Sequence, residues 1–147
     1  YMHWLAFNSL VRNRDILDEL FLYKVATPAK PNGFWKPVAW DYDDTMRPQK
    51  DSAFSSAVLY GCESEWDRQI NSSPRLFTRY CMILKRLLTL FLTPEALKRR
   101  LTACYAELQQ IDPKSDRKRA IEQYRDQLLS RRAKLLNRLR SLATRKQ

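Results

Sequence analysis

The chain has 147 residues, 44% of them hydrophobic and 12% aromatic, which excludes a disordered protein and allows a folded core. It contains only two glycines, Gly33 and Gly61, which disfavours sheet-rich folds and glycine-rich phosphate loops. Residues 1–73 carry 8 Lys/Arg against 10 Asp/Glu, whereas residues 74–147 carry 19 against 6. We therefore predict two parts, 1–73 and 74–147, and an anionic partner for the second.

The first predicted element is a helix from Trp4 to Lys24. Leu17, Leu20 and Phe21 fall on one face at helical spacing. The helix should end before Pro28, because the residue before a proline avoids the α region. The sequence starts at Tyr1 rather than Met, so we expect either that the chain was trimmed or that a leader was removed before Tyr1.

The middle of the chain, from Thr27 to Ser73, shows no sustained period. Four prolines interrupt it and large aromatic residues are scattered through it. Such a segment usually lies extended over another surface and is held there by its aromatic side chains. We expect Trp35 and Trp40 to anchor it, with a short helix around residues 53–60.

The remainder predicts three helices. The first runs from about Pro74 to Leu92, and Thr93 followed by Pro94 is a typical helix start, with a capping side chain and then proline. Asp112-Pro113 repeats this signal, or Asp116 caps instead, before a last helix that ends near Leu142. That helix has apolar residues at seven-residue spacing: Ile121, Leu128, Leu135 and Leu142.

The predicted fold class is therefore mainly α. A C-terminal three-helix unit with a long basic last helix follows an N-terminal helix and an extended, aromatic-rich segment. No run approaches the roughly 20 apolar residues of a membrane-spanning helix, so we predict no transmembrane span.

One short motif suggests catalysis. The run from Val38 to Thr45, with Asp41, Asp43 and Asp44, resembles the first motif of the haloacid dehalogenase phosphatases. That resemblance implies a nucleophilic Asp, an Asp acid/base and bound magnesium. The helical second half offers no further acidic pair on a strand end, so we interpret the run as a solvated acidic turn, or as an acidic patch that faces a basic neighbour.

Other catalytic arrangements are excluded by residue counts. His3 is the only histidine, the three cysteines form no CxxC pair, and no glycine-rich phosphate loop occurs. We predict a non-enzymatic protein without metal or cofactor.

Basic clusters and the apolar stripe are the predicted partner-binding features. Phosphate groups and acidic surfaces are readily bound by Lys and Arg on helices. The predicted contact residues, besides Trp35 and Trp40, are Arg79, Lys98, Arg99, Arg100, Arg117, Lys118, Arg119, Leu128, Arg131, Arg132 and Leu135.

The region from Leu76 to Leu142 resembles the LYR-motif family of small three-helix mitochondrial proteins. The resemblance rests on Tyr105 ahead of Asp112-Pro113, on the Ile and Leu spacing of the last helix, and on Leu76-Phe77-Thr78-Arg79 in place of Leu-Tyr-Arg. It implies an accessory subunit or assembly protein of a respiratory complex that docks on an acyl carrier protein.

A second likeness is to the small matrix-side subunit of ubiquinol–cytochrome c reductase. It covers Phe7-Asn8-Ser9-Leu10, the following Arg14-Asp15, and the stretch from Arg79 to Pro94. Together the two likenesses imply a non-catalytic subunit on the matrix side of the mitochondrial inner membrane. Its expected partners are other protein subunits, an acyl carrier protein or the anionic lipid cardiolipin. The alternative is a mitochondrial ribosomal protein that binds rRNA through its basic helices.

Overall fold

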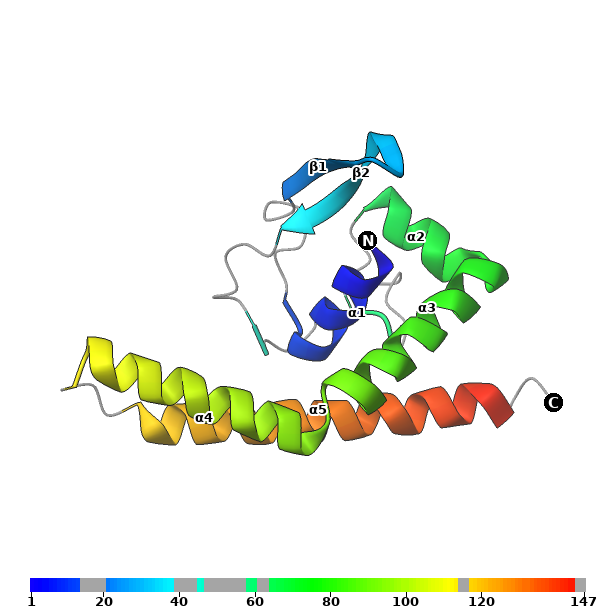
Figure 1. The fold of residues 1–147 in the computed structure, drawn as a ribbon. Coiled ribbons are helices and arrows are strands. Elements are labelled where there is room, and N and C mark those ends of the chain that lie inside the picture. Colours follow the sequence, from blue (N-terminus) through cyan, green and yellow to red (C-terminus); the bar gives the residue numbers. More distant parts are fainter. Residues whose placement is uncertain (14–20, 39–44, 47–57, 61–63, 114–116, 145–147) are drawn as a thin grey trace. The chain divides into compact units, whose positions relative to one another are not determined.

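The computed structural model describes residues 1–13, 21–38, 45–46, 58–60, 64–113 and 117–144 (Figure 1). The chain divides into two compact units, Tyr1–Ile83 and Leu84–Gln147, and each is described by itself. Most described residues are helical and a long helix ends the chain, so the predicted mainly α class is confirmed. No described helix is long and apolar enough to cross a membrane. The division into domains after residue 73 stays a prediction.

The first unit begins with helix α1 (Met2–Val11), which is shorter than the predicted helix. The prediction that the helix continues to Lys24 is wrong, because strand β1 occupies Phe21–Thr27. β1 pairs antiparallel with β2 (Lys30–Val38), and Phe21 lies opposite Val38. The helical spacing of Leu17, Leu20 and Phe21 gave a wrong prediction, because the pairing of β1 with a later strand overrides the local preference for a helix.

The hairpin occupies part of the segment that we expected to be extended. Thr27 pairs with Lys30, so Pro28 and Ala29 form the turn. Gly33 in β2 has φ +71°, and a Cβ atom there would lie 3.0 Å from the carbonyl oxygen of Val25. Both facts require glycine at this position. The short helix predicted around residues 53–60 falls mostly outside the described residues, and Val58–Tyr60 are not helical.

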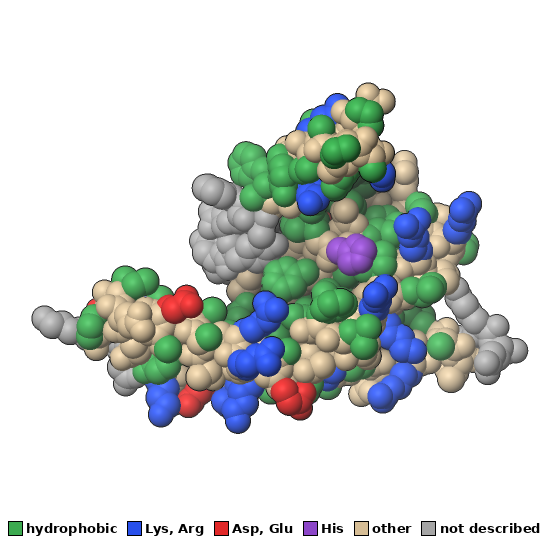
Figure 2. All heavy atoms as spheres, in the orientation of Figure 1, with side chains coloured by type: hydrophobic (Ala, Val, Ile, Leu, Met, Phe, Trp, Pro, Cys, Tyr) green, Lys and Arg blue, Asp and Glu red, His purple; other side chains and the backbone are tan. Residues whose placement is uncertain are grey.

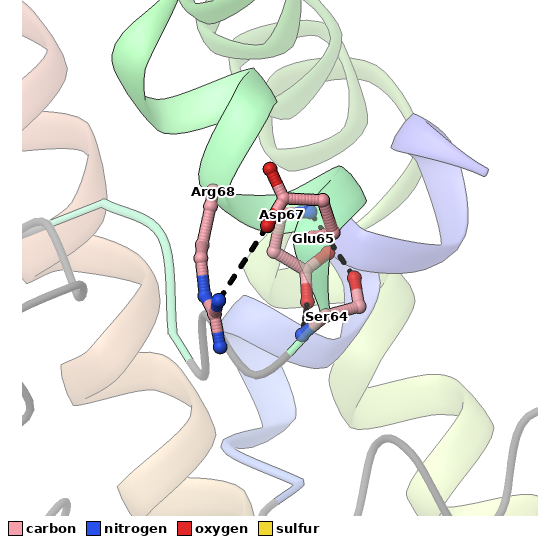
Figure 3. A network of polar contacts seen from close by, with 4 residues as sticks. All are labelled: Ser64, Glu65, Asp67 and Arg68. Carbon is pink, nitrogen blue, oxygen red and sulfur yellow. Dashed lines mark hydrogen bonds and ion pairs between the residues drawn. The ribbon is translucent and has the colours of Figure 1, made fainter.

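Helix α2 (Glu65–Ser72) starts with a capping box that the sequence analysis did not predict. The Ser64 hydroxyl accepts from the backbone N–H of Asp67 (3.1 Å), and the Asp67 carboxylate accepts from the backbone N–H of Ser64 (3.1 Å), as Figure 3 shows. The hydroxyl of Tyr1 donates to the same carboxylate at 2.6 Å. The buried Asp67 thus joins the start of α2 to the start of the chain.

The core of the first unit contains a buried tyrosine with a satisfied hydroxyl. Tyr80 on α3 (Pro74–Arg86) is fully buried. Its hydroxyl oxygen lies 2.8 Å from the Ser9 hydroxyl of α1 and donates to the carbonyl oxygen of Val58 at 2.9 Å. The backbone N–H of Tyr60 donates to Ser9 Oγ at 3.0 Å. One polar cluster therefore holds α1, the segment Val58–Tyr60 and α3 together.

The second unit contains a π-helical turn, η1 (Leu87–Phe91), and helices α4 (Pro94–Ile111) and α5 (Lys118–Thr144). α4 and α5 pack side by side and run in opposite directions (Figure 1). The predicted start of α4 is confirmed, because the Thr93 hydroxyl accepts from the backbone N–H of Ala96 at 3.2 Å and Pro94 follows. The predicted start at Asp112-Pro113 is wrong: Asp112 ends α4 and donates its N–H to Leu108, while α5 begins at Lys118.

Removing the Tyr80 hydroxyl should destabilise the first unit. Tyr80→Phe leaves the Val58 carbonyl buried without this donor, which costs about 1–3 kcal/mol. Urea unfolding measures the loss. Tyr23→Phe is the control. It removes a tyrosine hydroxyl from a side chain that is 47% exposed, so the free energy of unfolding should hardly change. Equal midpoints for the wild type and Tyr80→Phe would contradict the role of this hydrogen bond.

The first turn of α4 should make stability depend on pH. Hydrogen bonds from its own backbone N–H and from the Thr93 hydroxyl, with the charge of Arg132, hold the pKa of Glu95 below its usual value. A lowered pKa in the folded state stabilises the fold above the unfolded pKa, and this stabilisation is lost as the pH falls. Glu95→Gln should therefore lower stability near pH 7, and its difference from the wild type should shrink as the pH falls below the usual pKa of glutamate. Glu107→Gln, later in the same helix, is the control. A loss of stability by Glu95→Gln that is equally large at pH 7 and in acid would contradict the prediction.

Candidate functional site

The C-terminal end of α1 gathers buried polar side chains. Asn8 and Asn13 are 0% and 1% exposed, and Arg12 lies between them in the left-handed conformation (φ 54°). The Asn8 side-chain N–H donates to the carbonyl oxygen of Trp4 at 3.0 Å. Among the described residues, no partner is found for Asn8 Oδ1 or for Arg12 Nε, although both atoms are buried. Buried polar atoms of this kind usually have a structural partner or a bound group, so this polar end of α1 is a candidate site.

The chain returns to the polar end of α1 after the acidic run. The backbone N–H of Met46 donates to the carbonyl oxygen of Val11 at 2.8 Å. Met46 also has a positive φ, 61°, and left-handed non-glycine residues are concentrated at functional sites. Asp41, Asp43 and Asp44 lie outside the described residues. In the sequence they stand between Val38, which ends β2, and Thr45, which precedes Met46.

A shallow apolar hollow of about 230 Å³ lies elsewhere in the first unit. It is lined by Tyr1, Leu22, Trp35, Pro37 and Trp66. The rings of Tyr1 and Trp66 meet edge to face with centroids 5.3 Å apart. Trp35 is 63% exposed, so the predicted anchor is available for contact, whereas the second predicted anchor, Trp40, lies outside the described residues. Nothing in this hollow supplies a charge or a nucleophile.

The predicted basic residues are spread over both units. Arg79 is exposed on α3 in the first unit. Lys and Arg side chains gather along α4 and α5 on the face shown in Figure 2. Six of the predicted basic residues are exposed in the second unit: Lys98, Arg99, Arg100, Arg117, Lys118 and Arg119. Of these six, Lys98 of α4 and Lys118 of α5 line the same small groove.

Other predicted contact residues lie in the interior of the second unit. Leu128 and Leu135 are 4% and 0% exposed. Arg132 is half-buried, and its Nε–H is directed at the carbonyl oxygens of Leu88 (3.1 Å) and Leu92 (2.8 Å). These carbonyl groups belong to the π-helical turn and its end, so Arg132 caps them. Arg131 is half-buried beside it.

In the parts of the chain with described coordinates, no group of three or more His, Cys, Asp or Glu side chains could hold a metal ion. A metal site that uses Asp41 and Asp43 falls outside that search.

Comparison with known proteins decides the family. Residues 1–140 match the family described as CotH kinase protein. The chain belongs to this family. Neither the curated proteins nor the solved structures contain a match.

The family corrects several predictions. The resemblance to LYR-motif proteins and to a subunit of ubiquinol–cytochrome c reductase is wrong. The predicted function, a respiratory accessory subunit or alternatively a mitochondrial ribosomal protein, is therefore wrong as well. So is the predicted location on the matrix side of the mitochondrial inner membrane. The prediction of a non-enzymatic protein is contradicted as well, because the family is described as a kinase family. The resemblance misled because basic helices with Leu at seven-residue spacing pack in the same way in many unrelated proteins.

The sequence analysis missed the polar end of α1. A signal was present: Asn8 and Ser9 interrupt an apolar stretch in which Leu5, Ala6 and Leu10 are all fully buried. Buried amides inside an apolar helix face need partners, so they mark either a structural network or a site.

Replacing Arg132 should destabilise the second unit. Arg132→Lys keeps the charge but loses the Nε–H that bonds the Leu88 and Leu92 carbonyl groups, at a cost of about 1–2 kcal/mol. Arg138→Lys, at an exposed position of the same helix, is the matched control. Thermal unfolding monitored by circular dichroism compares them. If the two variants unfold at the same temperature, Arg132 does not act as this cap.

Proposed function

We propose that this chain takes part in phosphoryl transfer from a magnesium-bound nucleoside triphosphate, with the nucleotide-binding centre at the polar end of α1. The family's description as a kinase supports the reaction class. The location is supported by the hydrogen bond from the Met46 N–H to the Val11 carbonyl oxygen. This bond holds Met46, which follows the acidic run Asp41–Asp44 and Thr45 in the sequence, at the C-terminal end of α1.

The residues available suit the charge of such a substrate. Phosphoryl transfer requires the negative charge of the phosphates to be neutralised, usually by Mg²⁺ held on Asp carboxylates and Asn amide oxygens. Asp41 and Asp43 supply two carboxylates one residue apart in the sequence. Asn8 Oδ1 is a buried amide oxygen with no donor among the described residues. Magnesium held there would offset the phosphate charge and orient the transferred group.

The protein's own groups have separate roles in this proposal. Asp41 and Asp43 hold the metal ion, and Asn8 contributes a neutral oxygen at the edge of the site. Arg12 carries a positive charge at the same end of α1, where it favours a phosphate group. The hydrogen bond between Met46 and Val11 holds the residue that follows Thr45 at the end of α1 before the substrate binds.

Nucleotide binding and transfer test the proposal together. Calorimetry with ATP should show binding that requires Mg²⁺ and is lost with EDTA. Asp41→Asn or Asp43→Asn should remove this binding and lower transfer of labelled γ-phosphate to an acceptor protein by about 100-fold or more. Asp126→Asn, at an exposed position on α5, should leave both unchanged.

Two results would overturn the assignment. One is the absence of any magnesium-dependent nucleotide binding by the folded wild-type chain. The other is equal transfer by the wild type, Asp41→Asn and Asp43→Asn, which would place the metal ligands elsewhere.

A further inference from the structure

The second unit carries more positive charge than its own acids can neutralise. Leu84–Gln147 contains 17 Lys/Arg and 6 Asp/Glu, and this excess of 11 does not depend on where any side chain lies. The first unit has 10 of each and is neutral, so it cannot remove the excess. The whole chain therefore keeps a net charge of +11, which attracts an anionic partner.

The excess is concentrated in the second part of α5. Asp126 is the last acidic residue of the sequence, and 7 Lys/Arg follow it. Residues 145–147, which follow the described part of α5, include Arg145 and Lys146. They add positive charge and supply no acidic side chain. The charge of this end of the helix is thus not offset by its neighbours in the sequence.

Three of these cations form an exposed set on α5, which we call the basic surface: Lys134, Arg138 and Arg140. Among the described residues, Lys134 and Arg138 form no ion pair. The Arg140 guanidinium donates to the neutral amide oxygen of Asn137 at 3.4 Å and keeps its charge. The last turn of α5 contains no basic residue, so these cations are not placed to offset the helix dipole.

The acids earlier in α5 do not reach the basic surface. Asp126 is paired with Arg125 at 2.9 Å. It also lies eight residues before Lys134, which is about 12 Å along the helix axis. This separation exceeds the screening length of about 8 Å at physiological salt. The charge of Lys134 is therefore independent of this carboxylate.

The acids of α4 are directed elsewhere as well. Hydrogen bonds within its own turn and the charge of Arg132 lower the pKa of Glu95, so this carboxylate faces a cation that caps the π-helical turn. Glu107 lies about 18 Å further along α4. Because α4 and α5 run in opposite directions, that step leads away from the C-terminal end of α5 (Figure 1).

We propose that the basic surface docks an acidic segment of a partner protein. Guanidinium groups bind carboxylates through paired N–H donors, and Lys adds a further positive charge. Lys134 and Arg138 are one helical turn apart, about 6 Å along the axis. Glu side chains one turn apart on a partner helix have the same spacing, as in the charge pairs that flank coiled-coil seams.

Two other polyanions match this part of α5 less well. Residues 127–144 contain no aromatic side chain, whereas single-stranded nucleic acids are held by base stacking on aromatic rings. Every leucine in this stretch is buried or half-buried, so none is exposed to insert among lipid headgroups. Recognition here depends on the pairing of charges, which an acidic protein segment provides.

Fluorescence anisotropy with the full chain tests this inference. The probe is a labelled helical peptide with Glu at every fourth position, and the reference peptide has Gln at those positions. The chain should bind the Glu peptide about tenfold more tightly, because three exposed ion pairs that are weak singly act together. The preference should fall as the salt concentration rises. Lys134→Gln, Arg138→Gln and Arg140→Gln in one variant should remove it.

A matched variant carries the same change at the other end of α5. Arg117→Gln, Lys118→Gln and Arg119→Gln together also remove one Lys and two Arg. This variant should keep the preference for the Glu peptide. Circular dichroism checks that both triple variants fold. Equal weakening by the two variants would overturn the proposal in favour of general charge attraction.

Cross-linking gives a second readout that needs no variant. A carbodiimide joins a carboxylate to a lysine amine only when the two are in contact. Mass spectrometry should find the Glu peptide joined to Lys134, and cross-links at other lysines alone would contradict docking here. Tighter binding of RNA or of phosphatidylserine vesicles that the Lys134, Arg138 and Arg140 variant abolishes would also overturn the proposal.

The inference goes beyond the proposed phosphoryl transfer and does not depend on it. The assay contains no nucleotide, and the peptide is made without Ser, Thr or Tyr. Asp41→Asn should bind the Glu peptide as the wild type does. Loss of nucleotide binding and loss of peptide binding are therefore separate results, and each contradicts only one of the two proposals.

Discussion

The first unit depends on the buried hydroxyl of Ser9. It accepts the backbone N–H of Tyr60 and contacts the hydroxyl of Tyr80, which in turn donates to the Val58 carbonyl. Polar groups in an apolar core are tolerated only when they are paired, so these groups allow few alternative positions of the three segments. The cluster holds α1 in place through Ser9. It therefore also fixes the position of Asn8 and Arg12, which lie near the C-terminal end of the same helix. The packing that stabilises the unit is also what positions the candidate site.

The second unit uses its positive charge in two ways. Arg132 turns inward and bonds carbonyl groups that the π-helical turn leaves without helical partners. Lys98, Lys118 and Arg125 lie around an open groove instead. The same residue types thus bond a backbone carbonyl group in one place and line a surface groove in another. Net charge alone does not distinguish these roles, which depend on which face of α5 a residue occupies.

Local signals predicted much of the second half and little of the first. Thr93 and Pro94 specify the start of α4 through contacts within one turn, and the Leu spacing of α5 predicts its buried face. Strand β1 was missed because its state depends on pairing with residues up to Val38, which no local pattern reveals. The contact between Met46 and Val11 could not be predicted for the same reason, since Met46 reaches Val11 only through the fold. The family assignment failed because it relied on the half of the chain whose pattern is least specific.

The two halves of the sequence offer opposite charges to a phosphate group. Residues 1–73 carry a slight excess of acid, so a nucleotide phosphate there needs a bridging cation, which carboxylates such as Asp41 and Asp43 are suited to hold. Residues 74–147 carry a large excess of Lys and Arg and can contact a phosphate directly. A bridging metal suits a group that must react and leave, because it neutralises the charge that develops during transfer. Direct contact with cations suits a group that must only be held. The charge asymmetry along this sequence is therefore consistent with a bridging metal ion in the first half, as the proposed reaction requires.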